Sequence, residues 1–293
     1  MEKTVSLPSG PRGLLVPLDH DLVVQSRPST CFCRSVQKRF DADHGHMIAF
    51  IDTVRPFMNG SGVLSVREER PGNETDPFGN NGYFSGDDAR IAYAFVGALP
   101  PKRILEIGSG SSTTVFFKAM RDFAAPTTLT SIDHFPRASI RQIATDVIED
   151  AVLNVPLPCF ENLEAGDVLF HDGSHLTFNG TDRVHLFLES LQTLRPGVFV
   201  HIHDVSFPFD YTDALDGRGY SEQYILAATL LNSPSWHVLA PVCFLQSKGL
   251  VSNGGVPFWM QKLYIINQDM KVCNSVPFLS NSSSHVQVLN ELH

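Results

Sequence analysis

A short apolar segment that runs directly into a glycine-rich turn is the feature that most constrains the fold of this chain. Residues 103–107 read Arg-Ile-Leu-Glu-Ile, and Gly108-Ser109-Gly110 follows at once. The next residues, 111–122, can form a helix with an apolar face. A strand that passes through glycines into a helix is typical of a nucleotide-binding turn, because glycine lets the backbone approach a ligand closely.

Apolar and helix-compatible segments alternate along most of the chain. The expected strands are 103–107, 128–132, 167–171, 198–203, 236–244 and 261–266. The expected helices are 44–57, 85–97, 112–123, 136–150, 180–194 and 220–231. This alternation predicts an α/β protein with a Rossmann-like, doubly wound, mostly parallel sheet and a terminal antiparallel strand.

The chain is expected to have three parts. Residues 1–80 are read as an N-terminal arm over the Pro-, Ser- and Gly-rich positions up to about 40, one helix and a glycine-rich cover loop, with a helical lid. Residues 81–268 hold the alternating elements, and residues 269–293 form a polar C-terminal tail. At the start of helix 85–97, Ser85 is expected to cap the helix with Asp88 as its capping partner.

Composition argues against several classes of protein. The formal net charge is −9 and no run of Lys and Arg is present, which argues against a nucleic-acid partner. No apolar stretch approaches the roughly 20 residues that cross a bilayer, and Met1–Ser6 lacks the apolar core of a signal peptide. We therefore expect a cytoplasmic protein with a small-molecule substrate. The sequence leaves its oligomeric state open, a homo-oligomer included.

The amino-acid sequence of the glycine turn distinguishes two classes of cofactor. Ser111, Ser112 and Thr113 follow Gly110, so the third glycine of the dinucleotide pattern is missing. Here the chain resembles the class I S-adenosylmethionine (SAM) dependent methyltransferases, whose first motif reads acid-x-Gly-x-Gly and often continues into Ser-Thr. The resemblance makes residues 81–268 the methyltransferase domain and implies SAM as the cofactor.

The same resemblance implies roles for the residues around the turn. Asp133 follows strand 128–132, where these enzymes place an acid that binds the ribose hydroxyls of SAM. His134, next to it, would border the adenine. The residues implied to bind the rest of the cofactor, chiefly its amino-acid part, are Glu106, Gly108, Ser109, Gly110 and Ser112.

Two further strand ends carry Asp and His side chains. Asp172 and His175 follow strand 167–171, while His203 and Asp204 end strand 198–203. Helix 180–194 joins the two strands, so their carboxyl ends should lie side by side at the edge where open α/β sheets bind ligands. His201 lies deeper in its strand and is expected to have a structural role, and His171 is likewise expected to lie behind the site residues.

These ends resemble those of catechol O-methyltransferase-like enzymes and of a looser natural-product group that includes macrocin O-methyltransferase-like and cephalosporin hydroxylase-like proteins. By position, the resemblance implies a divalent ion (Mg, Mn or Fe) bound by Asp172, His203 and Asp204, and it implies His175 as the catalytic base in place of a Lys. His203 replaces an oxygen ligand and softens such a site. The alternative for His203 is a packed, hydrogen-bonded histidine without metal.

The sequence thus predicts a SAM-dependent methyltransferase that transfers a methyl group to a small molecule, at a hydroxyl oxygen. A histidine side chain has a reference pKa of ~6.5, so an imidazole at position 175 can accept the hydroxyl proton. Two alternatives stay open: a metal-dependent hydroxylase or oxygenase on the same fold, and a SAM-binding protein without catalysis. Glu222 is expected to be a first-turn acid of its helix, and Trp259 either shapes the substrate cavity or belongs to the core.

Overall fold

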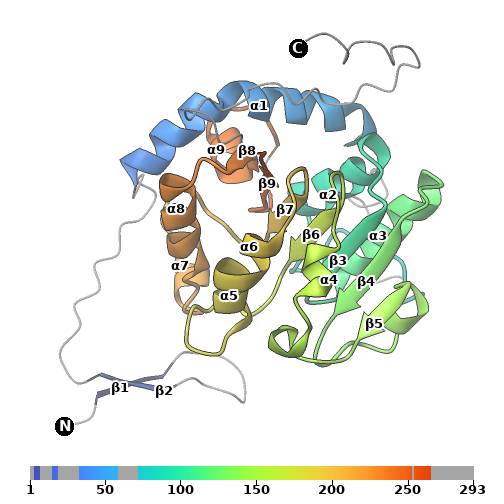
Figure 1. The fold of residues 1–293 in the computed structure, drawn as a ribbon, viewed down its shortest axis with the longest axis horizontal. Helices are drawn as coiled ribbons and strands as arrows, with labels where there is room; N and C mark the ends of the chain where they lie inside the picture. The colour runs from blue at the N-terminus through green and yellow to red at the C-terminus, as the bar shows by residue number, and fades with distance from the viewer. Residues whose placement is uncertain (1–2, 7–14, 19–32, 59–71, 253, 265–293) are drawn as a thin grey trace, which may run out of the picture. The chain divides into compact units, whose positions relative to one another are not determined.

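The computed structural model describes residues 3–6, 15–18, 33–58, 72–252 and 254–264. Within them, a seven-stranded sheet forms the centre of the fold, with strand order β5-β4-β3-β6-β7-β9-β8 (Figure 1). Its strands are β3 Arg103–Ile107, β4 Thr128–Ile132, β5 Asp146–Ile148, β6 Val168–His171, β7 Phe199–Ile202, β8 Trp236–Pro241 and β9 Phe258–Lys262. A separate two-stranded antiparallel sheet joins β1 Lys3–Ser6 and β2 Leu15–Leu18.

The large sheet confirms the expected fold class. Strands β5, β4, β3, β6 and β7 pair in parallel, whereas β9 is antiparallel to both β7 and β8. The antiparallel strand is the last one within the described residues, but it is inserted between β7 and β8 rather than placed at the edge of the sheet.

The pairing register brings the carboxyl ends of the central strands to one edge of the sheet. Ile107 of β3 pairs with Ile132 of β4 and with His171 of β6, and His171 pairs with Ile202 of β7. The residues that follow these strand ends therefore lie next to one another, as the sequence predicts.

Helices flank this sheet. The longest is α1, Arg34–Met58, which packs against β8 and against two other helices, α2 and α8. The other α-helical segments are α2 Asp87–Ala98, α3 Ser111–Asp122, α4 Pro158–Glu161, α5 Asp182–His185, α6 Leu191–Thr193, α7 Asp213–Asp216, α8 Glu222–Asn232 and α9 Val242–Ser247. A π-helical turn, η4 Leu186–Ser190, joins α5 to α6, and short 3-10 turns are η2 Ile140–Gln142 and η3 Val152–Asn154.

Aromatic side chains from helices and strands fill the core. The Trp259 indole on β9 is fully buried and stacks on Phe95 of α2, with ring centroids 4.9 Å apart. Phe50 of α1 lies 6.3 Å from both rings. Trp259 therefore belongs to the core, which is one of the two alternatives that the sequence left open. Helix α1 shares this core with the sheet.

Several expected elements differ from the structure. The helix expected over 136–150 is wrong: this segment holds only η2 and the short edge strand β5, whose Val147 pairs with Ser131 of β4. The strand expected over 236–244 ends at Pro241, where α9 begins, and the last strand lies at 258–262 rather than 261–266. Helix α1 begins ten residues before the expected 44.

The start of α2 also differs from the expected cap. Gly86 occupies the N-cap with a φ of 57°, and no side chain caps the helix. Asp88 instead accepts a hydrogen bond from the Val256 backbone NH at 3.0 Å.

The three-part division of the chain stays a prediction, and residues 59–71 of the cover loop and the tail 269–293 lie outside the described residues. None of the helices in the described part of the chain combines the length and apolar character needed to span a membrane.

Candidate active site

The glycine turn is held tightly between two neighbouring strands. The Gly108 backbone NH donates to the Ile132 carbonyl of β4 at 3.0 Å, and the Asp172 NH donates to the Ile107 carbonyl at 2.9 Å. Gly108 has a φ of 82°, and a Cβ added there would overlap the Asp172 carbonyl oxygen. Only glycine adopts this φ readily and leaves room for the Asp172 carbonyl, so the turn requires a glycine at this position.

Glu106 lies beneath this turn and is fully buried. Its carboxylate accepts hydrogen bonds from the hydroxyls of Ser112 at 2.7 Å, Thr113 at 2.7 Å and Ser131 at 2.6 Å. Burial raises the pKa of Glu106 to about 7, against the opposing effect of the three hydroxyls. The two carboxylate oxygens of Glu106 thus link the glycine turn and the start of α3 to the sheet. Contact of Glu106 with a cofactor stays a prediction.

Asp133 connects the end of β4 to the glycine turn. Its Oδ2 accepts hydrogen bonds from the Ser109 backbone NH at 2.9 Å and from the Ser109 hydroxyl at 2.6 Å. Its Oδ1 accepts from the Phe135 NH at 2.8 Å. Asp133 is half-buried and His134 is exposed, so both can be reached by a ligand over the turn.

A cavity of about 350 Å³ adjoins the turn. Its lining comes from the start of α3, from the segment before and within η2, and from the loop before α2: Gly110, Ser111, Thr114, Arg137, Ser139, Ile140, Glu74, Asp76, Phe78, Asn81 and Tyr83. The Asn81 side chain fixes this loop, because its amide donates to the Phe78 and Phe84 carbonyls at 2.7 and 2.8 Å. The cavity adjoins the turn but does not include the histidines described next.

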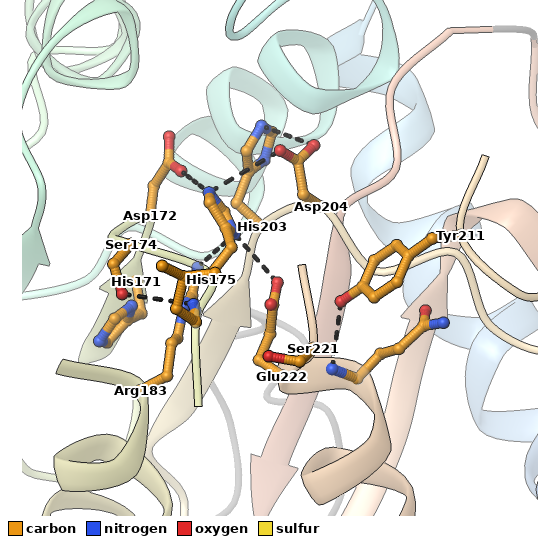
Figure 2. Close-up of polar contacts among 12 residues, drawn as sticks. His171, Asp172, Ser174, His175, Arg183, His203, Asp204, Tyr211, Ser221 and Glu222 are labelled. Atoms are coloured by element: carbon orange, nitrogen blue, oxygen red, sulfur yellow. Dashed lines mark hydrogen bonds and ion pairs between the residues drawn. The ribbon is translucent and has the colours of Figure 1, made fainter. Parts of the chain in front are cut away.

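Asp172, His175, His203 and Asp204, called the tip cluster below, converge as the sequence predicts (Figure 2). His175 Nε2 lies 3.3 Å from Asp172 Oδ1 and 3.8 Å from Asp204 Oδ2. His203 Nε2 lies 3.5 Å from Asp204 Oδ1. The imidazole of His175 therefore faces a space bordered by two carboxylates.

Two members of the tip cluster have unusual backbone conformations. His175 and Asp204 have φ values of 60° and 58°, in the left-handed region that residues other than glycine rarely adopt. Such a conformation costs of order 1–3 kcal/mol and persists only where the surroundings enforce it. Its occurrence at two facing residues of this cluster supports the interpretation of the cluster as a functional site.

The charges of the cluster are strongly coupled. Burial alone would lower the pKa of His203, but the carboxylates of Asp172, Asp88 and Asp204 outweigh it and raise the pKa to about 9. Burial likewise opposes the ionisation of Asp172, yet His203, His175 and Arg183 hold its pKa below the usual range. These opposite shifts favour the protonated form of His203 and the ionised form of Asp172.

Asp88 is a member of this site that the sequence did not reveal. Its Oδ1 lies 3.8 Å from His203 Nδ1, and burial raises its pKa to about 7. Two consecutive acids at a helix start are typical of ordinary helix-dipole stabilisation, so the pattern gave no signal of this contact. On the other side of the ring, His203 Nε2 lies 3.2 Å from the Tyr83 carbonyl oxygen.

Glu222 and Arg183 were also missed as partners of the site. Glu222 was expected only as a first-turn acid of its helix, yet it is fully buried and its Oε1 lies 2.9 Å from His175 Nδ1. Arg183 is fully buried too, and its Nη2 lies 2.9 Å from the same nitrogen. A Glu in the first turn of a helix is common, so position alone could not distinguish this one.

His201 and His171 are packed within the core, in agreement with their expected structural roles. The His201 ring stacks on Phe170 with centroids 4.2 Å apart and an interplanar angle of 5°. Burial lowers the pKa values of both histidines well below the usual value, so both rings are neutral.

The described residues do not present a ready metal site. Among them, no group of three or more His, Cys, Asp or Glu side chains is arranged to hold a metal ion. The two ring nitrogens of His203 lie beside the Tyr83 carbonyl oxygen, at 3.2 Å, and the Asp88 carboxylate, at 3.8 Å. Metal binding by Asp172, His203 and Asp204 stays a prediction.

Comparison with known proteins supports a family resemblance for the central part of the chain. Residues 105–205 match the family model of a methyltransferase domain, and this segment contains the glycine turn, Asp133 and the whole tip cluster. The match confirms the resemblance to methyltransferases that the motifs indicate. No curated protein matches the chain.

Several solved structures are similar to the chain. One is a methyltransferase of Podospora anserina bound to SAH, with 17% identity and a TM-score of 0.43, covering 83% of this chain and 100% of that one. A plantazolicin methyltransferase in complex with SAH has 12% identity and a TM-score of 0.40, covering 79% and 100%. A mycinamycin-pathway methyltransferase with Mg, SAH and mycinamycin VI has 12% identity and a TM-score of 0.36, covering 62% and 50%.

Proposed function

We propose that this chain, whose residues 105–205 match a methyltransferase domain, is a SAM-dependent methyltransferase that acts on a hydroxyl oxygen of a small molecule. The observation that carries the proposal is that the matched segment brings a glycine turn, an acid after the next strand and a histidine with carboxylates to one edge of the sheet. The first two features suit SAM, and the third suits removal of a proton from an acceptor.

In this proposal the glycine turn holds SAM. Gly108, Ser109 and Gly110 lie along its amino-acid part, with Glu106 and Ser112 supporting the turn from beneath through their hydrogen bond of 2.7 Å. Asp133 accepts hydrogen bonds from the ribose hydroxyls, and His134 borders the adenine. Asp133 already accepts two hydrogen bonds from Ser109, so binding of ribose and ordering of the turn are coupled.

The acceptor then lies between the turn and the tip cluster. SAM, when bound there, would supply its methyl group to the acceptor oxygen and leave as the neutral thioether, and the hydroxyl proton would pass to Nε2 of His175. Asp172 and Asp204 border that nitrogen at 3.3 and 3.8 Å and stabilise the imidazolium that forms. Alignment of oxygen, methyl and sulfur supplies most of the rate, and the proton transfer adds to it.

The test is transfer of labelled methyl groups from SAM to a panel of hydroxylated small molecules, with dioxygen consumption measured in parallel. We expect label on the oxygen of one class of acceptor and a loss of turnover of roughly 10²–10⁴-fold in His175→Ala, with SAM binding retained. An acceptor that is already ionised should be spared much of that loss, because no proton remains to be removed.

Two results would contradict the proposal. Dioxygen consumption with a hydroxylated rather than a methylated product would identify a hydroxylase. If His175→Ala impairs acidic and weakly acidic acceptors equally, His175 shapes the pocket and is not the base.

A further inference from the structure

The residues at the start of α8 hold His175 in place. The Ser221 backbone NH donates to the His175 carbonyl at 3.0 Å, and the Tyr220 ring stacks on the imidazole with centroids 4.1 Å apart. The Ser221 hydroxyl also accepts hydrogen bonds from the backbone NH and the hydroxyl of Thr177 at 3.1 and 2.9 Å. A loop 44 residues away in sequence is thus fixed to this helix start, which supports the left-handed backbone of His175.

Nδ1 of His175 has two buried partners of opposite kind. Glu222 Oε1 and Arg183 Nη2 each lie 2.9 Å from it (Figure 2). A guanidinium only donates hydrogen bonds, and a carboxylate only accepts them. Nδ1 therefore either donates to Glu222 or accepts from Arg183, and one tautomer of the neutral ring cannot do both.

The partner that Nδ1 takes decides what Nε2 can do. When Nδ1 accepts from Arg183, the single proton of the neutral ring is on Nε2, which then donates to Asp172 at 3.3 Å. When Nδ1 donates to Glu222, Nε2 keeps a lone pair that faces the space between Asp172 and Asp204. Only the second tautomer can take a proton at Nε2.

We propose that Glu222 is a positioning residue for His175: it opposes Arg183 at Nδ1 and keeps the proton there, so that Nε2 is free to accept the proton of the acceptor hydroxyl. This inference rests on the proposed function. Glu222 itself touches no reacting atom. Because Arg183 Nη2 is a donor, Glu222 is the acceptor for an Nδ1 proton among the described residues around this nitrogen.

The contacts of Glu222 support a role beyond packing. The Nε and Nη1 atoms of Arg183 are buried and have no hydrogen-bond partner among the described residues, whereas Glu222 also contacts the Tyr211 hydroxyl. Leaving such groups unpaired is costly in a protein interior. A buried carboxylate and a buried guanidinium that each lie 2.9 Å from the same imidazole nitrogen are better explained by their effect on that imidazole.

The experiment compares the parent protein with Glu222→Gln by ¹⁵N NMR of labelled histidine, with His175→Gln used to assign the ring. The amide of Gln can donate as well as accept, so it no longer opposes Arg183. We expect the parent to carry the proton on Nδ1 and the variant to carry it on Nε2. With SAM and acceptor, kcat should fall roughly 10²–10⁴-fold while the Kd for SAM stays unchanged. Glu161→Gln makes the same chemical change at an exposed site and should match the parent.

A second variant tests the role of Glu222 if the Glu222→Gln protein does not fold properly. Glu222→Gln combined with Arg183→Met removes the competing donor, so the Gln carbonyl can accept the Nδ1 proton and part of kcat should return. A merely structural role of Glu222 predicts a double variant that is worse than either single one. Circular dichroism and SAM affinity verify that each variant is folded.

The NMR result separates this inference from the proposed function. An Nε2-protonated ring in the parent, or an unchanged tautomer in Glu222→Gln, overturns the role of Glu222 even if methyl transfer is confirmed. An Nδ1-protonated parent that switches in the variant upholds the role of Glu222 in setting the tautomer, even if no methyl transfer is found, and then the proposed function alone has failed.

Discussion

Glu106 provides a quantitative prediction about stability and pH. Its carboxyl is buried beneath the glycine turn, and burial raises its pKa from 4.5 to about 7. Because the folded protein holds this proton more tightly than the unfolded chain, Glu106 favours folding fully below pH 4.5. That contribution falls as pH rises and is gone above about 7. The two pKa values differ by 7 − 4.5 = 2.5, which corresponds to about 3 kcal/mol.

The assay is urea unfolding of the parent and of Glu106→Gln at a series of pH values from 5 to 8. Gln stays neutral, so the variant should gain stability relative to the parent as pH rises, by up to about 3 kcal/mol over the full range. Asp88, whose pKa is also about 7, is present in both proteins, so its contribution cancels in the difference. Glu161→Gln, an exposed matched change, should show a constant difference.

The result that refutes this reasoning is a stability difference between parent and Glu106→Gln that does not vary with pH. In that case the hydroxyls of Ser112, Thr113 and Ser131 stabilise the carboxylate enough to offset its burial. A difference in the free energy of unfolding that is the same at every pH would reflect only a change in hydrogen bonding. A contribution from ionisation would make that difference vary with pH.

Two further predictions concern the turn and the core. Gly108→Ala should destabilise the protein strongly and abolish SAM binding, because its Cβ would overlap the Asp172 carbonyl; normal thermal stability would show that the turn is looser than described. Trp259→Ala should lower the free energy of unfolding by roughly 3–5 kcal/mol through loss of its stacking in the core, as measured by urea unfolding; a loss of substrate affinity without a loss of stability would place Trp259 in the substrate cavity instead.

The central strands and the glycine turn could be predicted because their signals are local. Strand β3 and helix α3 are each encoded by a continuous run of residues, and glycines join the two runs. The Asp and His side chains of the site directly follow the strand ends in the sequence, so they could be identified together with the strands. Strand β5 could not be found in this way. It has three residues, and its pairing with β4 rather than its own sequence makes it a strand.

The part of the site that sequence reasoning missed depends on contacts between distant segments. Glu222 meets His175 across 47 positions, and Asp88 meets His203 across 115. Each of these acids has an ordinary local explanation at the start of a helix. Only the fold shows that they are buried against histidines, so the sequence predicts the tip cluster but not the acids and the arginine around it.

The measurement that tests the central claim most directly is calorimetric titration of the protein with SAM and with NAD. The account predicts that SAM binds and NAD does not, and that Asp133→Ala weakens SAM binding by roughly 1.5–3 kcal/mol, whereas Asp146→Ala, an exposed acid on β5, does not. Binding of NAD without SAM, or equal SAM affinity in the parent and Asp133→Ala, would contradict it.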